Sequence, residues 1–242
     1  METTAPSATE TPSEPSADRS YQKLATRIGA LIKHGEFEVG ARLPSERSLA
    51  ERFEVSRTLV REAIIVLEIQ GLVEVRGGSG IYVCASANAA ARSTTFKPLA
   101  GPGPFELLRA RCLIEAEIAA TAAEHRKDAD LDRIFAALAA MREHMHDKAA
   151  NEAADRLFHL RIAEASGNSV LLQMVTTLWD HTKAPIWSQM EAHFHTPALR
   201  LASQDDHQRV FNALLERDAA GARAAMRAHI ERVIGEFAQA WR

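Results

Sequence analysis

Two stretches decide the fold: Leu43-Pro-Ser-Glu-Arg-Ser-Leu-Ala-Glu-Arg-Phe-Glu-Val-Ser-Arg-Thr-Leu-Val-Arg-Glu-Ala63 and Gly77-Gly-Ser-Gly-Ile-Tyr-Val83. The first predicts two short helices joined by a tight turn, with Ser45 and Ser56 as N-caps, because a serine hydroxyl can satisfy free N–H groups at a helix start. The second predicts a β-hairpin, because alternating segments flank its glycines. With a helical pattern over 20–35, these elements predict a winged helix-turn-helix over 20–84, a fold that places one helix in the major groove of DNA.

Polar side chains are concentrated at the start of the helix predicted over 57–70. Arg57 and Arg61 are four residues apart and therefore share one helical face, and a bidentate arginine–guanine pair contributes about 1–3 kcal/mol of base discrimination. Glycines at the wing tip allow close approach to the DNA backbone. The alternative is that these arginines are solvated surface charges. The predicted DNA contacts are Arg47, Ser56, Arg57, Thr58, Arg61 and Gly78.

Composition limits the remaining possibilities. The chain has 242 residues, 46% of them hydrophobic, which is enough for one or two ordinary cores. No run of about 18 apolar residues and no secretory leader is visible, so we expect a cytoplasmic protein with no membrane partner. Cys84 and Cys112 fit free thiols in a reducing compartment. The net charge of −3 comes from residues 1–19, so bulk charge alone does not indicate nucleic-acid binding.

The pattern along the chain divides it into four segments. Residues 1–19 are rich in Thr, Ser, Pro and Glu and predict a disordered tail, and residues 85–103 predict a linker. Residues 104–242 have helical periodicity almost throughout, which predicts a six- or seven-helix all-α bundle and makes the protein mostly α-helical. Asp128, Asn168 and Asp218 are expected N-caps. The expected helices are 104–125, 128–147, 149–166, 169–191, 198–217 and 219–241.

A second set of residues has the spacing of a metal site. Asp155 and His159 are at positions i and i+4 and project from one helical face, so they could provide two ligands of one ion. His207 and His229 lie on later predicted helices. Three imidazoles and one carboxylate suit Zn²⁺, Ni²⁺ or Mn²⁺, and an octahedral ion would keep positions open for an anionic ligand. The alternative is that these histidines are ordinary surface or packed residues.

The residues from Leu43 to Ala63, with Gly71-Leu-Val-Glu-Val-Arg and Gly80-Ile-Tyr-Val, closely resemble the DNA-binding domain of GntR-family regulators. That resemblance implies double-stranded operator DNA as a partner. It assigns groove and phosphate contacts to the arginines and hydroxyl residues named above, and it places Gly78 at the wing tip. Leu59 occupies a position where some relatives have a polar contact residue.

The segment from Asp155 to Asn168 resembles the FCD effector domain of the FadR subfamily. This resemblance implies that Asp155, His159, His207 and His229 bind a divalent metal, with zinc favoured over nickel or manganese, beside a small carboxylate effector. Further segments, among them Gly103 to Glu115, are similar to repressors of bacterial hexuronate catabolism, which implies a uronate or a keto-uronate as effector. The implied effector contacts are Arg111 and Asn168.

Two residues of the predicted effector domain have competing interpretations. Arg111 could anchor a carboxylate through its planar guanidinium, or it could form a structural ion pair with Glu115 one turn later. Trp179 and Trp187 are predicted to lie in the core rather than in the effector pocket.

These patterns predict a homodimeric repressor that a small carboxylate releases from its operator. A regulator responding to another organic or sugar acid is one alternative, and a metal-responsive regulator is another. A metalloenzyme is disfavoured, because no nucleophile–base pair or phosphate-binding loop accompanies the metal motif. We therefore expect no enzymatic activity.

Overall fold

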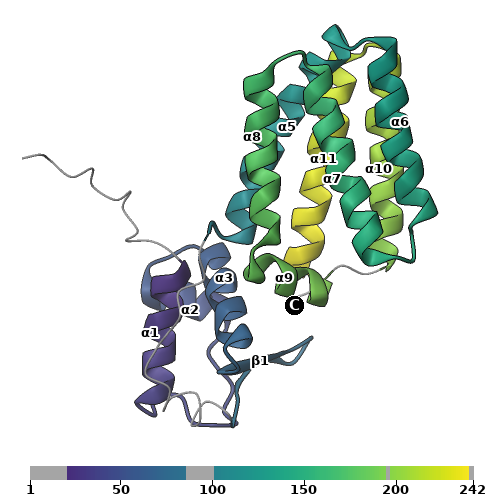
Figure 1. Ribbon diagram of the computed structural model, residues 1–242. Coiled ribbons are helices and arrows are strands. Elements are labelled where there is room, and N and C mark those ends of the chain that lie inside the picture. Colours follow the sequence, from purple (N-terminus) through teal and green to yellow (C-terminus); the bar gives the residue numbers. More distant parts are fainter. Residues whose placement is uncertain (1–20, 86–100, 195–196, 240–242) are drawn as a thin grey trace, which may run out of the picture.

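A computed structural model describes residues 21–85, 101–194 and 197–239 of the chain. The expected tail over 1–19 and most of the expected linker over 85–103 lie outside the described residues. The described part is mostly α-helical and has one small antiparallel sheet, as predicted, and Figure 1 shows an N-terminal unit followed by a larger helical bundle.

The N-terminal unit contains three helices and a hairpin. Its helices are α1 (Tyr21–Lys33), α2 (Glu46–Phe53) and α3 (Arg57–Ile69), and its strands are β1 (Val73–Arg76) and β2 (Gly80–Val83). The side chains of Ser45 and Ser56 accept hydrogen bonds from the third backbone N–H beyond them, at 3.2 Å each, so both predicted N-caps are confirmed. The hairpin pairs Val73 with Val83, and the apolar faces of α1 and α3 pack together.

Seven α-helices follow among the described residues from Gly101 onward. Figure 1 shows most of them running side by side along the long axis of the bundle. Helix α11 packs against α5 and α10, and α7 packs against α5, α6 and α8. The helices are α5 (Pro104–His125), α6 (Asp128–Glu143), α7 (Lys148–Ala165), α8 (Ser169–Asp180), α9 (Pro185–Phe194), α10 (Pro197–Leu215) and α11 (Ala219–Gln239), and a short 3-10 turn, η2 (His181–Lys183), separates α8 from α9.

Two expectations about these helices were wrong. A single helix was expected over 169–191, but the chain breaks at Ala184, which adopts an extended conformation (φ −67°, ψ 145°). The following Pro185 explains the break, because proline disfavours the helical conformation of the residue before it. The N-cap of α6 is Lys127 rather than Asp128, and the side chain of Asp130 accepts the Lys127 N–H at 2.7 Å. Asn168 is the N-cap of α8, as expected.

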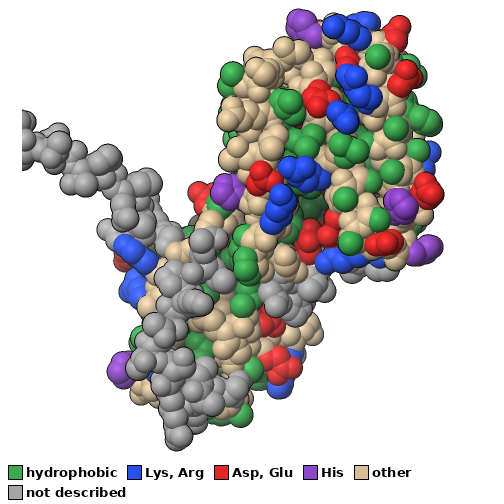
Figure 2. All heavy atoms as spheres, in the orientation of Figure 1, with side chains coloured by type: hydrophobic (Ala, Val, Ile, Leu, Met, Phe, Trp, Pro, Cys, Tyr) green, Lys and Arg blue, Asp and Glu red, His purple; other side chains and the backbone are tan. Residues whose placement is uncertain are grey.

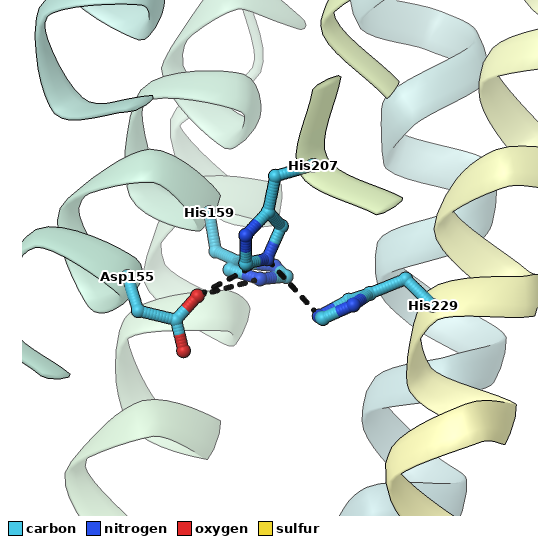
Figure 3. A group of neighbouring side chains, drawn as sticks. All are labelled: Asp155, His159, His207 and His229. Atoms are coloured by element: carbon cyan, nitrogen blue, oxygen red, sulfur yellow. Dashed lines mark hydrogen bonds and ion pairs between the residues drawn. The ribbon is translucent and has the colours of Figure 1, made fainter. Parts of the chain in front are cut away.

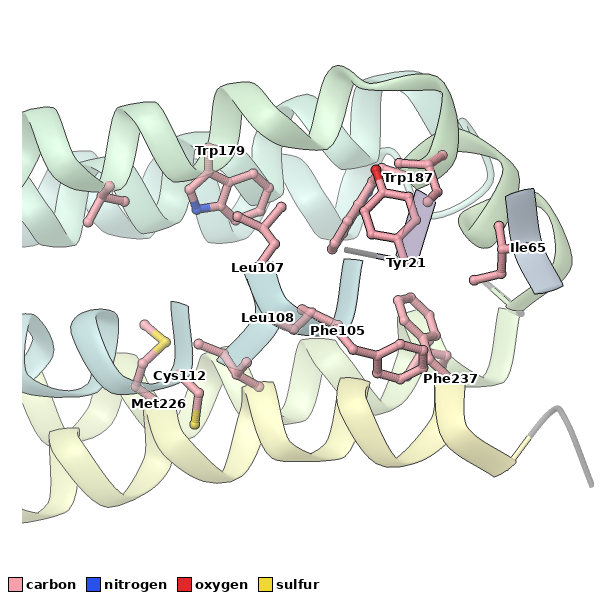
Figure 4. Packing of buried hydrophobic residues seen from close by; sticks show 14 of the residues in the cluster. Tyr21, Ile65, Phe105, Leu107, Leu108, Cys112, Trp179, Trp187, Met226 and Phe237 are labelled. Carbon is pink, nitrogen blue, oxygen red and sulfur yellow. The ribbon is translucent and has the colours of Figure 1, made fainter. Parts of the chain in front are cut away.

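The bundle has a continuous apolar core. Figure 4 shows Phe105 and Leu108 of α5 packed with Phe237 of α11, and Trp187 lies in the same cluster. On the face shown in Figure 2, acidic and basic side chains alternate over the helical bundle and form no large patch of one sign. None of the described helices is long and apolar enough to cross a membrane.

The first turn of α5 joins the bundle to α3. Glu62 of α3 is 3% exposed, and its Oε1 accepts hydrogen bonds from the backbone N–H groups of Phe105 at 2.9 Å and Glu106 at 3.2 Å. Nη2 of Arg109 donates to Oγ1 of Thr58 at 2.9 Å. A carboxylate from one unit therefore caps the N-terminus of the first helix of the other, where free N–H groups need acceptors.

Candidate metal centre, effector cavity and DNA-facing residues

The four predicted metal ligands come together inside the bundle. Asp155 and His159 project from α7, His207 from α10 and His229 from α11, and Figure 3 shows their polar ends pointing toward one another. The three imidazoles are almost fully buried. Oδ1 of Asp155 lies 3.2 Å from Nε2 of His207 and 3.6 Å from Nε2 of His159, and Nε2 of His207 lies 3.1 Å from Nε2 of His229.

These separations fit a shared metal ion. Ligand atoms about 2.1 Å from an ion lie about 3.0 Å apart at a right angle and about 3.4 Å apart in a tetrahedron. Oδ1 of Asp155 and Nε2 of His159 are buried and have no hydrogen-bond partner among the described residues. Because buried polar atoms without partners are costly, the donor set matches a metal better than it matches a network satisfied by hydrogen bonds alone.

Two buried carboxylates flank this cluster. Glu115 of α5 accepts a hydrogen bond from Nδ1 of His159 through Oε2. Asp206 of α10 accepts from Nε of Arg232 at 2.6 Å, and it lies 3.7 Å from Nδ1 of His229. A carboxylate that accepts a hydrogen bond from a histidine ligand fixes the orientation of the ring, so Glu115 extends the site beyond its four ligand residues. Asp206 adds a negative charge beside His229.

Electrostatics keeps the carboxylates of this site ionised. Burial alone would raise the pKa of Glu115, but Arg111 and His159 lower it to about 2. Burial also opposes ionisation of Asp155, yet the neighbouring His159 and His207 rings hold its pKa well below the ordinary value. Burial, with repulsion from His207, lowers the pKa of His229 to about 3 and keeps that ring neutral. Ionised carboxylates and a neutral His229 match the protonation states that a metal requires. Burial opposes protonation of His159, but Glu115 and Asp155 outweigh it and raise the pKa of that ring, so metal binding there would displace a proton.

A cavity of about 380 Å³ opens beside the four ligands, with Asp155 and His229 in its wall. Arg111 of α5 lies in the same wall, 4% exposed, with its guanidinium carbon 3.8 Å from the ring centre of Trp179. Trp179 and Trp187 are buried, as predicted, but both also line the cavity, so the expectation that they lie only in the core was wrong.

Arg111 combines both interpretations that the sequence left open. Its Nε donates to Oε1 of Glu115 at 2.7 Å, which is the expected ion pair. Its terminal nitrogens have no hydrogen-bond partner among the described residues, and the residue lines the cavity. Arg111 is therefore held by Glu115 and still offers donors to a ligand.

Asn168 does not lie where the sequence placed it. It is exposed and absent from the wall of the cavity, and its Oδ1 accepts the backbone N–H groups of Val170 at 3.0 Å and Leu171 at 3.3 Å. The N-cap role already uses this side chain, so the effector contact expected of Asn168 finds no support in the structure.

The predicted DNA contacts fall into two groups. Arg47, Ser56, Arg57 and Gly78 are exposed at the start of α2, the start of α3 and the wing tip, where they can reach DNA. The side chain of Arg57 is 58% exposed, and its Nη2 lies 3.6 Å from Glu46. Gly78 has φ of +70°, a left-handed conformation that favours glycine.

Arg61 and Thr58 are engaged within the protein. The Arg61 side chain is 12% exposed, and its Nε donates to both carboxylate oxygens of Glu46 at 2.9 and 3.0 Å. Thr58 accepts the bond from Arg109 described above. In this structure Arg61 joins α3 to α2, so a direct base contact from Arg61 would require that ion pair to open.

Comparison with known proteins settles the family. The family described as "Bacterial regulatory proteins, gntR family" matches residues 20–83, and the FCD domain matches residues 106–232. The Uxu operon transcriptional regulator of Escherichia coli (strain K12) is 40% identical over 225 residues, which cover 90% of this chain and 86% of that protein. The chain belongs to the GntR family. This GntR-family regulator binds DNA and has an FCD domain, and it acts in transcription rather than as an enzyme.

Other relatives extend the comparison. The Exu regulon transcriptional regulator of Escherichia coli (strain K12) is 38% identical over 224 residues, covering 88% of this chain and 82% of that protein. LutR of Bacillus subtilis (strain 168), an HTH-type transcriptional regulator, is 36% identical over 213 residues, covering 84% and 94%. The solved structure of Streptococcus agalactiae GntR is 26% identical, covers 89% of this chain and 99% of that chain, and has a TM-score of 0.47.

Sequence reasoning missed three residues that this GntR-family regulator places at functional positions. Glu115 was paired only with Arg111, because helical spacing reveals neighbours on one helix but not the contact that His159 makes from another. Asp206 gave no signal of its own, because its partner Arg232 lies 26 residues later on another helix. Glu62 carried no signal at all, because its partners are backbone N–H groups 43 and 44 residues away.

Proposed function

We propose that this protein is a repressor that a small carboxylate, bound beside a metal ion, releases from its operator. The observation that carries the proposal is the position of Arg111 in the wall of the cavity that also exposes Asp155 and His229. A volume of about 380 Å³ suits a small molecule, since ligand pockets are about 300–1,000 Å³.

The charge of this site supports an anionic effector. Asp155, His159, His207 and His229 would hold the metal, which would supply Lewis-acidic positions for the oxygens of a ligand. Asp155 neutralises one charge of a divalent ion, and Arg111 and Glu115 neutralise each other. A positive charge remains beside the cavity, so a carboxylate is the ligand that best completes the site.

The proposed effector is a hexuronate or a keto-uronate. Supporting this are the similarity to the Uxu and Exu regulators and the resemblance of the sequence to repressors of hexuronate catabolism. A hexuronate also carries hydroxyl groups, and the polar residues Ser188, Ser203 and Thr182 are among those that line the cavity. The proposed DNA-binding form is a homodimer, because a two-fold symmetric protein matches a pseudo-palindromic operator.

The test is fluorescence anisotropy of the full chain on its own upstream DNA, titrated with glucuronate, galacturonate and their keto isomers. Release by one of them at micromolar to low-millimolar concentration supports the proposal and names the effector. If DNA binds but all four compounds are without effect, the uronate assignment fails. Release by another organic acid, or by changing the metal concentration alone, would then select one of the two alternatives stated above.

A further inference from the structure

The carboxylate of Glu115 contacts the metal site and the effector site at once. Glu115 is 2% exposed, and its two oxygens have different partners. Oε1 accepts from Nε of Arg111 at 2.7 Å on the same helix, and Oε2 accepts from Nδ1 of His159 on α7. Losing either partner would leave a buried carboxylate oxygen unsatisfied, so the carboxylate favours fixed orientations of both side chains.

The bond to His159 determines which ring nitrogen can bind a metal. A carboxylate can only accept hydrogen bonds, so Nδ1 of His159 carries a proton and donates it. The neutral ring then has its lone pair on Nε2, which faces Oδ1 of Asp155 at 3.6 Å in the ligand cluster. Glu115 therefore selects the tautomer of His159 that can act as a ligand.

The bond to Arg111 determines which nitrogens of its guanidinium can bind the effector. It uses Nε alone, and the ring of Trp179 supports the guanidinium from one side at 3.8 Å. The terminal nitrogens are left for the cavity. If Arg111 rotated to follow a ligand, the carboxylate shared with His159 would lose one of its two partners, so the two side chains cannot move independently.

We propose that Glu115 is a positioning residue that couples metal binding to effector binding in this FCD domain. The proposal rests on the proposed function, because it takes a carboxylate beside the metal as the effector. Metal binding fixes the orientation of His159. The hydrogen bonds of Glu115 then hold Arg111 in the orientation that receives the carboxylate. By thermodynamic linkage, the carboxylate then strengthens metal binding by the same factor.

The experiment measures Zn²⁺ affinity of the full chain by competition with a chromophoric chelator, with and without glucuronate or galacturonate. The variant is Glu115→Gln, which has the same shape but can accept only one of the two hydrogen bonds and must direct an N–H group toward the other donor. We expect Zn²⁺ affinity to fall about 10- to 100-fold, as for other groups that orient metal ligands. We also expect the uronate to change Zn²⁺ affinity in the wild type but not in the variant.

The matched control is Asp206→Asn. Asp206 is also buried, at 1% exposure, and lies beside a histidine ligand, but its hydrogen bonds go to Arg209 and Arg232 rather than to Arg111. This variant should keep the effect of uronate on Zn²⁺ affinity. Circular dichroism of each variant checks folding. A ¹⁵N–¹H correlation spectrum of the Zn²⁺-loaded wild type should show the His159 proton on Nδ1.

Three results would overturn the proposal: unchanged Zn²⁺ affinity in Glu115→Gln, equal loss of coupling in both variants, or no effect of either uronate on Zn²⁺ affinity in the wild type. Failure of the proposed function looks different. In that case uronates leave the operator complex intact, whatever Glu115 does to Zn²⁺ affinity.

Discussion

Replacing Glu62 with glutamine should change how the stability of the protein depends on pH. The pKa of Glu62 is raised from 4.5 to about 7, mainly by burial and also by Glu106, while the two backbone N–H groups at the start of α5 and Arg109 oppose the shift. A helix N-terminus favours a negative charge by about 0.3–1 kcal/mol, up to about 2 in a partly buried site, whereas burying an unpaired carboxylate costs several kcal/mol. Burial therefore dominates.

The sign follows from proton linkage. The folded protein holds the Glu62 proton more tightly than the unfolded chain, so the stabilisation is fully present below pH 4.5 and is lost as the pH rises toward 7. A pKa change of this size corresponds to about 3 kcal/mol. For a protein of this length that difference is equivalent to about 6–12 °C in melting temperature.

Glutamine is the matched substitution, because its Oε1 can accept the same two backbone bonds without a charge at any pH. The melting temperatures of wild type and Glu62→Gln should be measured together from pH 5 to pH 8, so that contributions from all other groups cancel in the difference. We expect the variant to gain stability relative to the wild type as the pH rises. A difference that stays flat, or one that falls with pH, would refute the argument that burial outweighs the helix N-terminus.

Three further predictions concern the DNA surface and the metal site. Arg57→Ala should weaken operator binding by about 1–3 kcal/mol in an anisotropy titration while leaving melting temperature and effector binding unchanged, and a matching loss of stability would contradict the DNA role. His207→Ala should still bind operator DNA but lose the effector response, so normal release by this variant would separate the metal from the effector site. Zn²⁺ at about 100 times its Kd should stabilise the wild type by about 2.7 kcal/mol, an increase in melting temperature that EDTA reverses, and no increase would argue against a metal site.

The sequence predicted local structure well because local structure depends on local signals. Serine N-caps, the proline after Ala184 and the spacing of Asp155 and His159 can all be read from neighbouring residues. Even so, the proline was overlooked as the end of a helix, because the apolar pattern continues across it. The sequence predicted Asn168 as an N-cap from capping chemistry and as an effector contact from the family resemblance. The structure shows the N-cap.

Interactions between helices were beyond the reach of sequence patterns. Arg61 looked like a base contact because spacing placed it beside Arg57, but the carboxylate that binds it comes from α2. Glu115 looked like half of a local ion pair, and its second partner comes from α7. The partners on other helices were missed for one reason: a single sequence shows periodicity within an element but not how two elements face each other.

Helix α5 connects the DNA-binding unit to the effector cavity, and this gives a last prediction. Glu62 caps its first turn, and Arg111 lies six residues after Phe105, about 9 Å along the helix axis. A Cβ at Gly103 would lie 2.4 Å from the Glu62 carboxylate. Gly103→Ala should therefore weaken the contact between Glu62 and the first turn of α5, while the changed residue itself lies just before α5. Gly235→Ala in α11 is the control, because a Cβ there meets nothing within 4 Å.

Gly103→Ala should leave effector affinity unchanged in calorimetry, since the substitution lies outside the cavity wall. It should reduce the ratio of operator Kd values measured with and without effector, and the most it can remove is the whole coupling, typically 5- to 150-fold. The physical reason is that a helix packed along its length moves as a rigid body, so a displacement that α5 carries from Arg111 is passed to α3 through the contact at Glu62. An unchanged ratio in Gly103→Ala would mean that the signal reaches the DNA-binding unit by another route.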